Sequence, residues 1–152
     1  MSRVKLPQER FAFIEMLAFW MGAVRNKDLE HQFGITRHQA YKDFALHQEL
    51  HPGYFIKKDK ACYECIDHQQ PPHFSGGLED FLIWLETGSF TLSQPLADTC
   101  ASRLQLPERR ISRQVVAKLV QAIHQKARVE VDYVSLSNPE HEGRIFSPHS
   151  IV

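Results

Sequence analysis

The sequence predicts an α+β fold, because hydrophobic residues follow a helical period in some blocks of the chain and strict alternation in others. Three blocks with helical spacing open the chain, and a pair of short alternating segments follows them. Further helical blocks and a second alternating pair fill the second half. We therefore expect two small modules along the chain.

The composition is that of an ordinary globular protein. Of 152 residues, 43% are hydrophobic and 24% are charged, and 18 basic side chains balance 18 acidic ones. These values exclude wholesale disorder and collagen-like or coiled-coil fibres. Three cysteines are too few for a disulfide framework, and no apolar run approaches the roughly 18 residues of a membrane span. We expect a cytoplasmic protein that does not contact a membrane.

The first two predicted helices lie close together. An amphipathic helix is predicted from Pro7 to Ala23, where apolar residues recur at helical spacing. Asn26 is predicted to cap a short helix over residues 27–32. That helix is expected to end at Gly34, because glycine readily adopts the left-handed conformation that closes many helices.

Thr36 and Gln39 have the spacing of a capping box, which predicts the start of a third helix. In this motif the Thr36 hydroxyl accepts a hydrogen bond from the Gln39 backbone amide, and the Gln39 side chain reaches back to the Thr36 amide. The helix is expected to end near Leu50, before His51-Pro52-Gly53.

A hairpin is predicted after that turn, with strands over residues 54–58 and 61–66 and a tip at Asp59-Lys60. The stretch from Asp67 to Gly77 contains Pro71-Pro72 and Gly76-Gly77, so we interpret it as a linker. The expected organisation is a first domain at 1–66, a linker region at 67–111 with a helix over 78–87, and a second domain at 112–152.

The second domain is predicted to be small and incomplete. A helix is expected from Ser112 to about Lys126, followed by strands over residues 128–135 and 143–146. A two-stranded hairpin has little stability by itself. We therefore expect the domain to continue beyond Val152, and the open hairpin edge and the apolar stripe of residues 78–85 to be covered by a second copy of the chain.

The order of helix, short helix, glycine turn, helix and basic hairpin is that of a winged helix-turn-helix, whose second motif helix enters the DNA major groove. In the third predicted helix, Ala40 and Phe44 face one way, whereas His38, Tyr41 and Lys42 share the opposite face, which has no carboxylate. A surface without acids suits contact with phosphates. The predicted DNA-binding residues are Arg25, Lys27, Thr36, Arg37, His38, Gln39, Tyr41, Lys42, Lys57, Lys58 and Lys60.

These residues are expected to form two sets, one that contacts bases and one that contacts phosphates. His38, Gln39 and Tyr41 of the third helix are predicted to approach or read bases. Three lysines lie at or beside the hairpin tip and are predicted to contact phosphates: Lys57, Lys58 and Lys60.

Two sets of residues carry a resemblance to a known family. The first comprises Gly34-Ile35-Thr36, Gln39-Ala40, Asp43, Gln48-Glu49-Leu50 and Pro52-Gly53, and the second comprises residues 129–135 and Arg144-Ile145-Phe146-Ser147-Pro148-His149. Together they resemble bacterial WYL-domain transcriptional regulators with an N-terminal winged helix-turn-helix, particularly the repressors beside BREX and CBASS phage-defence operons. The Trp-Tyr-Leu signature of that family would lie beyond Val152, so the resemblance implies a chain truncated at its C-terminus.

The resemblance implies a homodimeric repressor at the bacterial nucleoid that binds a palindromic operator. An Sm-like sensor domain would control it by binding an unidentified small-molecule or nucleic-acid effector. Tyr133, Ser135, Arg144 and His149 are the residues of this chain that could form part of an anion-binding surface in such a domain. No other cofactor is expected.

Other functions remain open on the sequence alone. Cys62, Cys65, His68 and His73 have residue types and spacing that zinc accepts, although a strand would point Cys62 and Cys65 to opposite faces. The winged helix could also serve protein contact without binding DNA. An enzyme is not expected, because no paired acidic cluster, phosphate-binding loop, Gly-x-Ser-x-Gly or His-Glu-x-x-His occurs.

Overall fold

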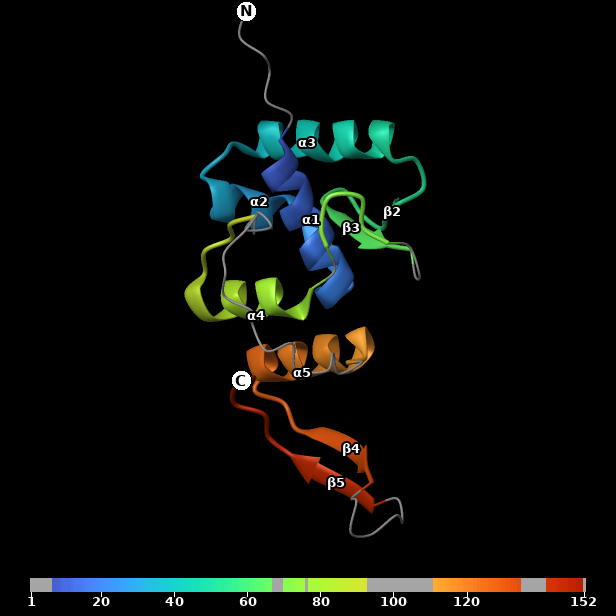
Figure 1. Cartoon of the computed structure of the whole chain (residues 1–152), viewed down its shortest axis with the longest axis vertical. Helices are drawn as coiled ribbons and strands as arrows, with labels where there is room; N and C mark the ends of the chain where they lie inside the picture. Colours follow the sequence, from blue (N-terminus) through green and yellow to red (C-terminus); the bar gives the residue numbers. More distant parts are fainter. Residues whose placement is uncertain (1–6, 67–69, 76, 93–110, 135–141, 152) are drawn as a thin grey trace, which may run out of the picture. The chain divides into compact units, whose positions relative to one another are not determined.

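The computed structural model describes residues 7–66, 70–75, 77–92, 111–134 and 142–151. The chain divides into a winged-helix unit, Met1–Arg110, and a hairpin unit, Ile111–Val152. The order of elements is α1 (Gln8–Met21), β1 (Ala23–Arg25), α2 (Asn26–Phe33), α3 (Arg37–Leu50), β2 (Phe55–Lys57), β3 (Cys62–Cys65), α4 (Leu78–Thr87), α5 (Arg113–Gln125), β4 (Val129–Tyr133) and β5 (Glu142–Phe146) (Figure 1). This α+β architecture confirms the predicted fold class.

Helix α1 forms the centre of the winged-helix unit and contacts α2, α3, α4, β1 and β3 (Figure 1). The prediction of an amphipathic helix is therefore wrong for most of its length. Its buried residues surround the helix and are Phe11, Ala12, Phe13, Ile14, Glu15, Met16, Leu17, Ala18 and Trp20. The helix ends at Gly22, which has φ 84° and donates its N–H to the Ala18 carbonyl. A largely apolar surface from Phe11 onward suits a helix that is covered by other elements on several sides.

A three-stranded antiparallel sheet lies beside α1, in the strand order β1-β3-β2. Strands β2 and β3 are the predicted hairpin, here called the wing, whereas β1 was not predicted. Strand β3 pairs on both edges, because Tyr63 lies opposite Val24 of β1 and opposite Lys57 of β2. The Asn26 N–H also bonds the Ala61 carbonyl at 3.2 Å. The wing is thereby tied to the first residue of α2.

The start of α2 differs from the prediction by one residue. Asn26 lies inside the helix and is buried, and Arg25 is the capping position. The Arg25 backbone N–H donates to the Asp28 carboxylate at 2.7 Å. Burial raises the pKa of Asp28, although its bond from Arg25 acts in the opposite direction. The helix ends at Gly34 with φ 61°, as predicted.

Helix α4 packs on α1, so residues 78–87 belong to the winged-helix unit and not to a separate linker. The Phe81 ring stacks on Trp20 with centroids 5.9 Å apart, and the Trp84 ring nitrogen donates to Gln32 at 2.9 Å. Part of the apolar stripe that we expected a second copy to cover is therefore buried within the same chain.

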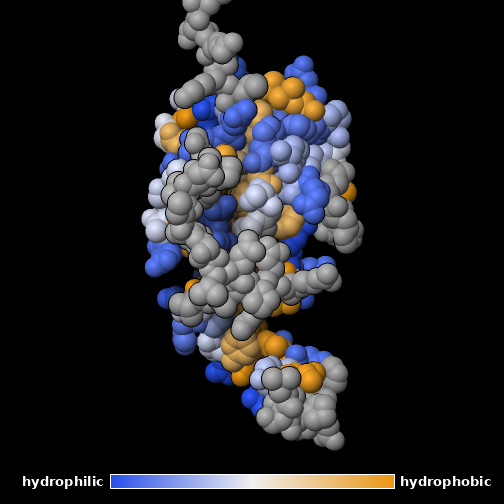
Figure 2. Space-filling model, viewed as in Figure 1, coloured by the Kyte–Doolittle hydropathy of each residue, from blue (hydrophilic) through white to orange (hydrophobic). Residues whose placement is uncertain are grey.

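The hairpin unit contains α5 and the antiparallel pair β4–β5, in which Val131 lies opposite Arg144. Helix α5 follows Ser112, as predicted, and its Val116 and Val120 are buried. Val134, Ile145 and Phe146 are exposed, and Figure 2 shows hydrophobic residues at the surface of this unit. Among the described residues, no helix is both long and apolar enough to cross a membrane.

Candidate nucleic-acid interface

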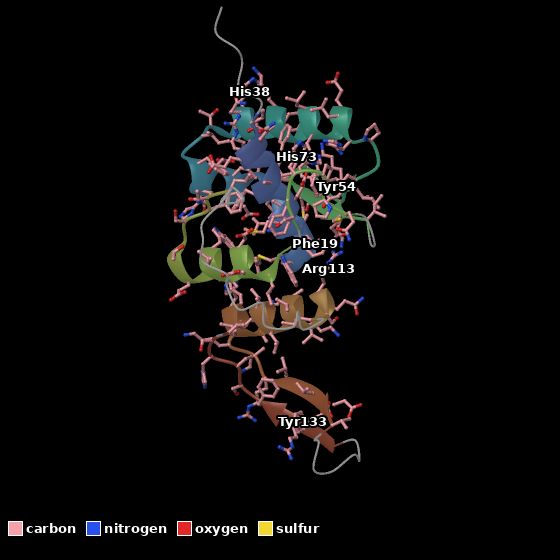
Figure 3. All side chains as sticks on the ribbon, in the orientation of Figure 1. Phe19, His38, Tyr54, His73, Arg113 and Tyr133 are labelled. Carbon is pink, nitrogen blue, oxygen red and sulfur yellow. The ribbon has the colours of Figure 1, made fainter. Side chains whose placement is uncertain are left out.

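The two faces of α3 have different chemistry. Ala40, Asp43, Phe44 and His47 are buried, and the residues exposed along the first two turns are Arg37, His38, Tyr41, Lys42 and Ala45. Figure 3 shows His38 on the outer side of α3 and His73 on the side that faces α1. The predicted division into a core face and an exposed basic face is confirmed over these turns. The prediction that the outer face has no carboxylate is wrong for the last turn, where the exposed Glu49 lies four residues after Ala45 on the same side.

The inner face of α3 is fixed by an aromatic contact and by an ion pair. The Phe44 ring stacks on Tyr63 with centroids 4.0 Å apart and an interplanar angle of 9°. Asp43 accepts two hydrogen bonds from the Arg10 guanidinium of α1, at 2.6 and 3.2 Å. Asp43 is thus buried and paired, so it adds no free negative charge to the outer face.

The outer face of α3 meets the wing in a shallow pocket. The pocket is lined by Asn26, Arg37, His38, Tyr41 and Lys60, which come from the start of α2, from α3 and from the wing tip. Three of these side chains can carry positive charge, and none is acidic. This arrangement offers hydrogen-bond donors and cationic groups to an anion such as a phosphate.

The wing lysines differ in their surroundings. The Lys57 ammonium lies 5.3 Å from the Tyr41 ring centroid and 5.9 Å from that of Tyr63, which joins the wing to α3 by cation–π contact. Lys58 bonds Glu64 at 2.6 Å, and this hydrogen bond raises the pKa of Lys58. At the tip, the Asp59 carboxylate accepts the Ala61 N–H.

These elements match a known family. The family model described as "BrxR transcriptional regulator winged helix-turn-helix domain" matches residues 7–87, just over half of the chain. The chain belongs to this BrxR family. The match covers α1 to α4 and includes the whole interface described above. It confirms the predicted class, a transcriptional regulator with an N-terminal winged helix-turn-helix.

The chain is also similar to curated relatives over nearly its whole length. Two proteins named "DNA-binding transcriptional repressor CapW", one from Escherichia coli strain KTE188 and one from Escherichia coli, are each 29% identical to it over 156 aligned residues. The alignments cover 95% of this chain and 50% of each relative, so the chain spans about half the length of the curated relatives it matches.

In the BrxR-type domain of this chain, the predicted capping box is only half formed. The Thr36 hydroxyl accepts the Gln39 backbone N–H at 3.2 Å, as predicted. The Gln39 side chain instead donates to Asp43 at 2.9 Å, so the prediction that it bonds the Thr36 backbone amide is wrong. The Gln39 side-chain N–H donates to an ionised carboxylate that Arg10 already orients, and this bond holds the side chain away from the Thr36 backbone N–H. Gln39 is therefore bonded within the protein and is less suited to read bases.

The remaining predicted DNA-binding residues lie around the same pocket. Arg25 precedes α2 and is exposed, and Lys27 is exposed in its first turn. Both are neighbours of Asn26, which lines the pocket but was expected only to cap α2. The place of Asn26 in the pocket could not be predicted from the sequence. Its burial depends on β3, which pairs with β1 and lies far from Asn26 in the chain.

Of the predicted effector-binding set, the structure brings two residues together. The Arg144 guanidinium carbon lies 5.1 Å from the Tyr133 ring centroid, across the β4–β5 pair. His149 is exposed, and Ser135 lies outside the described residues. The alternation of β4 and β5 explains the contact, because Tyr133 and Arg144 are diagonal neighbours on one face.

Within the described part of the chain, Cys62 and Cys65 do not belong to a group of three or more residues with metal-binding spacing. Cys62 is buried and Cys65 is half-buried within β3, and His68 lies outside the described residues. His73 instead bonds Glu15, with its ring Nδ1 at 2.8 Å from Oε1 and its backbone N–H at 2.7 Å from Oε2. Among the described residues, Glu15, His47 and His73 are the one group with metal-binding spacing. The sequence signal for Glu15 is an acid in the middle of the apolar stretch over residues 11–18.

Proposed function

We propose that this chain binds a specific DNA operator through α3 and the wing and represses transcription. The observation that carries the proposal is the basic outer face of α3 over residues 37–45, where no acid is exposed and which shares a pocket with Lys60 of the wing. Membership of a transcriptional regulator family supports DNA as the ligand. Repression is proposed from the name of the CapW relatives.

The residues divide by position. His38 and Tyr41 occupy the outer face of the helix that would enter the major groove, so we assign base contacts to them. Arg37, Lys42, Lys57 and Lys60 are assigned to phosphates, with Arg25 and Lys27 contacting the backbone beside α2. Lys58 is assigned a weaker contact, because Glu64 already pairs with its charge.

The proposal also covers assembly and control. A homodimer that reads a palindromic operator would present two copies of α3 to half-sites about one helical turn apart. The exposed apolar residues of the hairpin unit support self-association. We further propose that a small-molecule or nucleic-acid effector binds near Tyr133 and Arg144, with Ser135 and His149 close to them in sequence. Such a regulator would act in the bacterial cytoplasm.

DNA affinity is expected to fall steeply with salt. About six phosphate contacts imply a slope near −5 in a plot of log affinity against log salt, at about −0.9 per phosphate. The measurement is fluorescence anisotropy of the full chain on a duplex from the region upstream of its own gene, located by footprinting. A slope near zero, or no binding at low salt, would favour the alternative in which the winged helix serves protein contact.

Substitutions are expected to separate base contacts from phosphate contacts. Lys60→Ala should weaken binding to operator and random DNA alike. It should also reduce the salt slope by about 1, because binding then releases about one counterion fewer from the DNA. His38→Ala should cost about 1–3 kcal/mol on the operator and much less on random DNA. Lys118→Ala is the matched control, since Lys118 is an exposed lysine of α5 outside the proposed interface. Equal losses for all three variants would contradict the assignment.

A further inference from the structure

A buried polar cluster joins α1, α3 and the segment at residues 70–75. It consists of Glu15 of α1, His47 of α3 and His73, and we call it the Glu15 cluster. Glu15 Oε1 lies 2.7 Å from His47 Nε2 and 2.8 Å from His73 Nδ1. Glu15 Oε2 accepts the backbone N–H groups of His73 at 2.7 Å and Phe74 at 2.9 Å. One carboxylate therefore connects three segments that are distant in the sequence.

The negative charge of Glu15 has no arginine or lysine partner among the described residues. The Glu15 side chain is 0% exposed, and its ion pairs in this part of the chain are with His47 and His73. Burial alone would raise the pKa of Glu15, but the hydrogen bonds from the two histidines lower it below its ordinary value. Asp43, the other buried acid that the structure describes, pairs instead with Arg10. Buried charges in proteins are paired or coordinate metal ions, so the surroundings of Glu15 suit a cation.

The donor atoms of the Glu15 cluster have the composition and spacing of a transition-metal site. They are two imidazole nitrogens and one carboxylate oxygen, and they all lie within 4.8 Å of one another. Zinc binds this combination of ligands, at about 2.0–2.2 Å from each. Two ligands of a tetrahedral zinc lie roughly 3.3 Å apart, so the contacts to Glu15 Oε1 must lengthen by about half an ångström around an ion. His73 is 23% exposed and lies outside helices and strands, which leaves it room to move.

The groups behind the donor atoms hold them in place. Backbone N–H groups occupy Glu15 Oε2, as ligating carboxylates are commonly bonded through their second oxygen. The ring of His47 is fixed by aromatic packing, with centroids 5.2 Å from Phe11 and 4.8 Å from Phe55. Its Nδ1 is buried and has no hydrogen-bond partner among the described residues, so this packing orients the ring in place of a hydrogen bond.

A further imidazole lies beside the cluster. His51 follows His47 by about one turn of α3, and its ring centroid lies 5.1 Å from that of His47 and 4.9 Å from that of His73. Histidines four residues apart share one face of a helix and bind a single zinc ion in some proteins. His51 and His73 are both partly exposed, so this side of the cluster gives an ion a path from solvent.

We propose that the Glu15 cluster binds one divalent transition-metal ion of the zinc class, with Glu15 Oε1, His47 Nε2 and His73 Nδ1 as its ligands. The ion takes the place of the two imidazole protons that face Oε1, and these protons pass to solvent. It ties α1 and α3 to residues 70–75 and so stabilises the winged-helix unit. Without the ion, the hydrogen bonds described above satisfy Glu15. The site contains neither Cys62 nor Cys65, and it does not depend on the proposed DNA-binding function.

The test titrates the full chain, free of any affinity tag and stripped with a chelator, with zinc chloride in a calorimeter. We expect about one zinc ion per chain. The midpoint of thermal unfolding should rise as free zinc increases, because the ion binds the folded chain. His73→Ala removes the most exposed ligand and should weaken zinc binding at least about tenfold. His124→Ala is the matched control, because His124 is an exposed histidine of α5, and its effect should stay within about twofold.

A measurement on the unaltered protein keeps the proposal testable if the His73 variant fails to fold. Proton–nitrogen NMR should show zinc-dependent shifts of the ring nitrogens of His47 and His73 and none for His124. Failure to bind zinc stoichiometrically, equal affinities of His73→Ala and the control, or shifts confined to other histidines would each overturn the proposal. Zinc binding that is lost in Cys65→Ala but kept in His73→Ala would place the ion at the cysteines and would also overturn it. None of these measurements involves DNA, so a failure here leaves the proposed function to its own tests.

Discussion

Replacing Glu15 with alanine is expected to lower the free energy of unfolding by about 3–5 kcal/mol. The change leaves the His47 ring N–H and the backbone N–H groups of His73 and Phe74 without their acceptor. The bonds from His47 and Phe74 are buried, so water does not replace these two hydrogen bonds when Glu15 is lost. Chemical denaturation followed by circular dichroism measures the effect.

The matched control is Glu9→Ala, because Glu9 is an exposed acid in the first turn of the same helix. Its loss should stay below about 1 kcal/mol. The pKa of Glu15 is lowered in the folded chain, so its stabilising effect is complete above its ordinary value of 4.5 and disappears as the pH falls through the folded pKa. A Glu15→Ala loss no larger than that of the control, at pH 7, would contradict the account of the cluster.

Replacing Phe44 with alanine is expected to cost about 3–5 kcal/mol of folding stability. Phe44 is 0% exposed and packs α3 against the wing through its stacking on Tyr63. Its removal leaves a cavity between two elements that must keep a fixed separation to contact DNA together. Thermal and denaturant unfolding give the stability, and anisotropy on the operator gives the affinity.

Tyr41→Ala is the matched variant on the opposite face of α3. Tyr41 is 47% exposed, so its stability loss should be below about 1 kcal/mol. Operator affinity should nevertheless fall, because Tyr41 lines the basic pocket and supports Lys57. If Tyr41→Ala destabilised the fold as much as Phe44→Ala, the assignment of inner and outer faces would be wrong.

The features predicted correctly from the sequence depend on neighbouring residues. Gly34 ends α2 and Thr36 caps α3, and both are properties of a few consecutive residues. The exposed residues at the start of α3 follow from its helical period. Short-range patterns therefore predicted most of the proposed DNA surface.

The features that were missed depend on distant residues. Strand β1 is three residues long, and its pairing with β3 gives it a strand conformation that its own sequence does not require. Glu15 bonds His73 across 58 positions, so its buried partners could not be read from the surrounding apolar helix. Helix α4 was placed in a linker because its contact with Trp20 depends on tertiary packing.

The position of β3 between β1 and β2 has a consequence for the DNA itself. Since β3 is hydrogen-bonded along both edges, the wing cannot swing without breaking the pairing that leads into α2. A protein surface of fixed width leaves the duplex to adapt its groove width and its bend. The energy of that deformation depends on sequence, with pyrimidine–purine steps bending most easily. Operators of this regulator would then be selected partly at base pairs that no side chain touches.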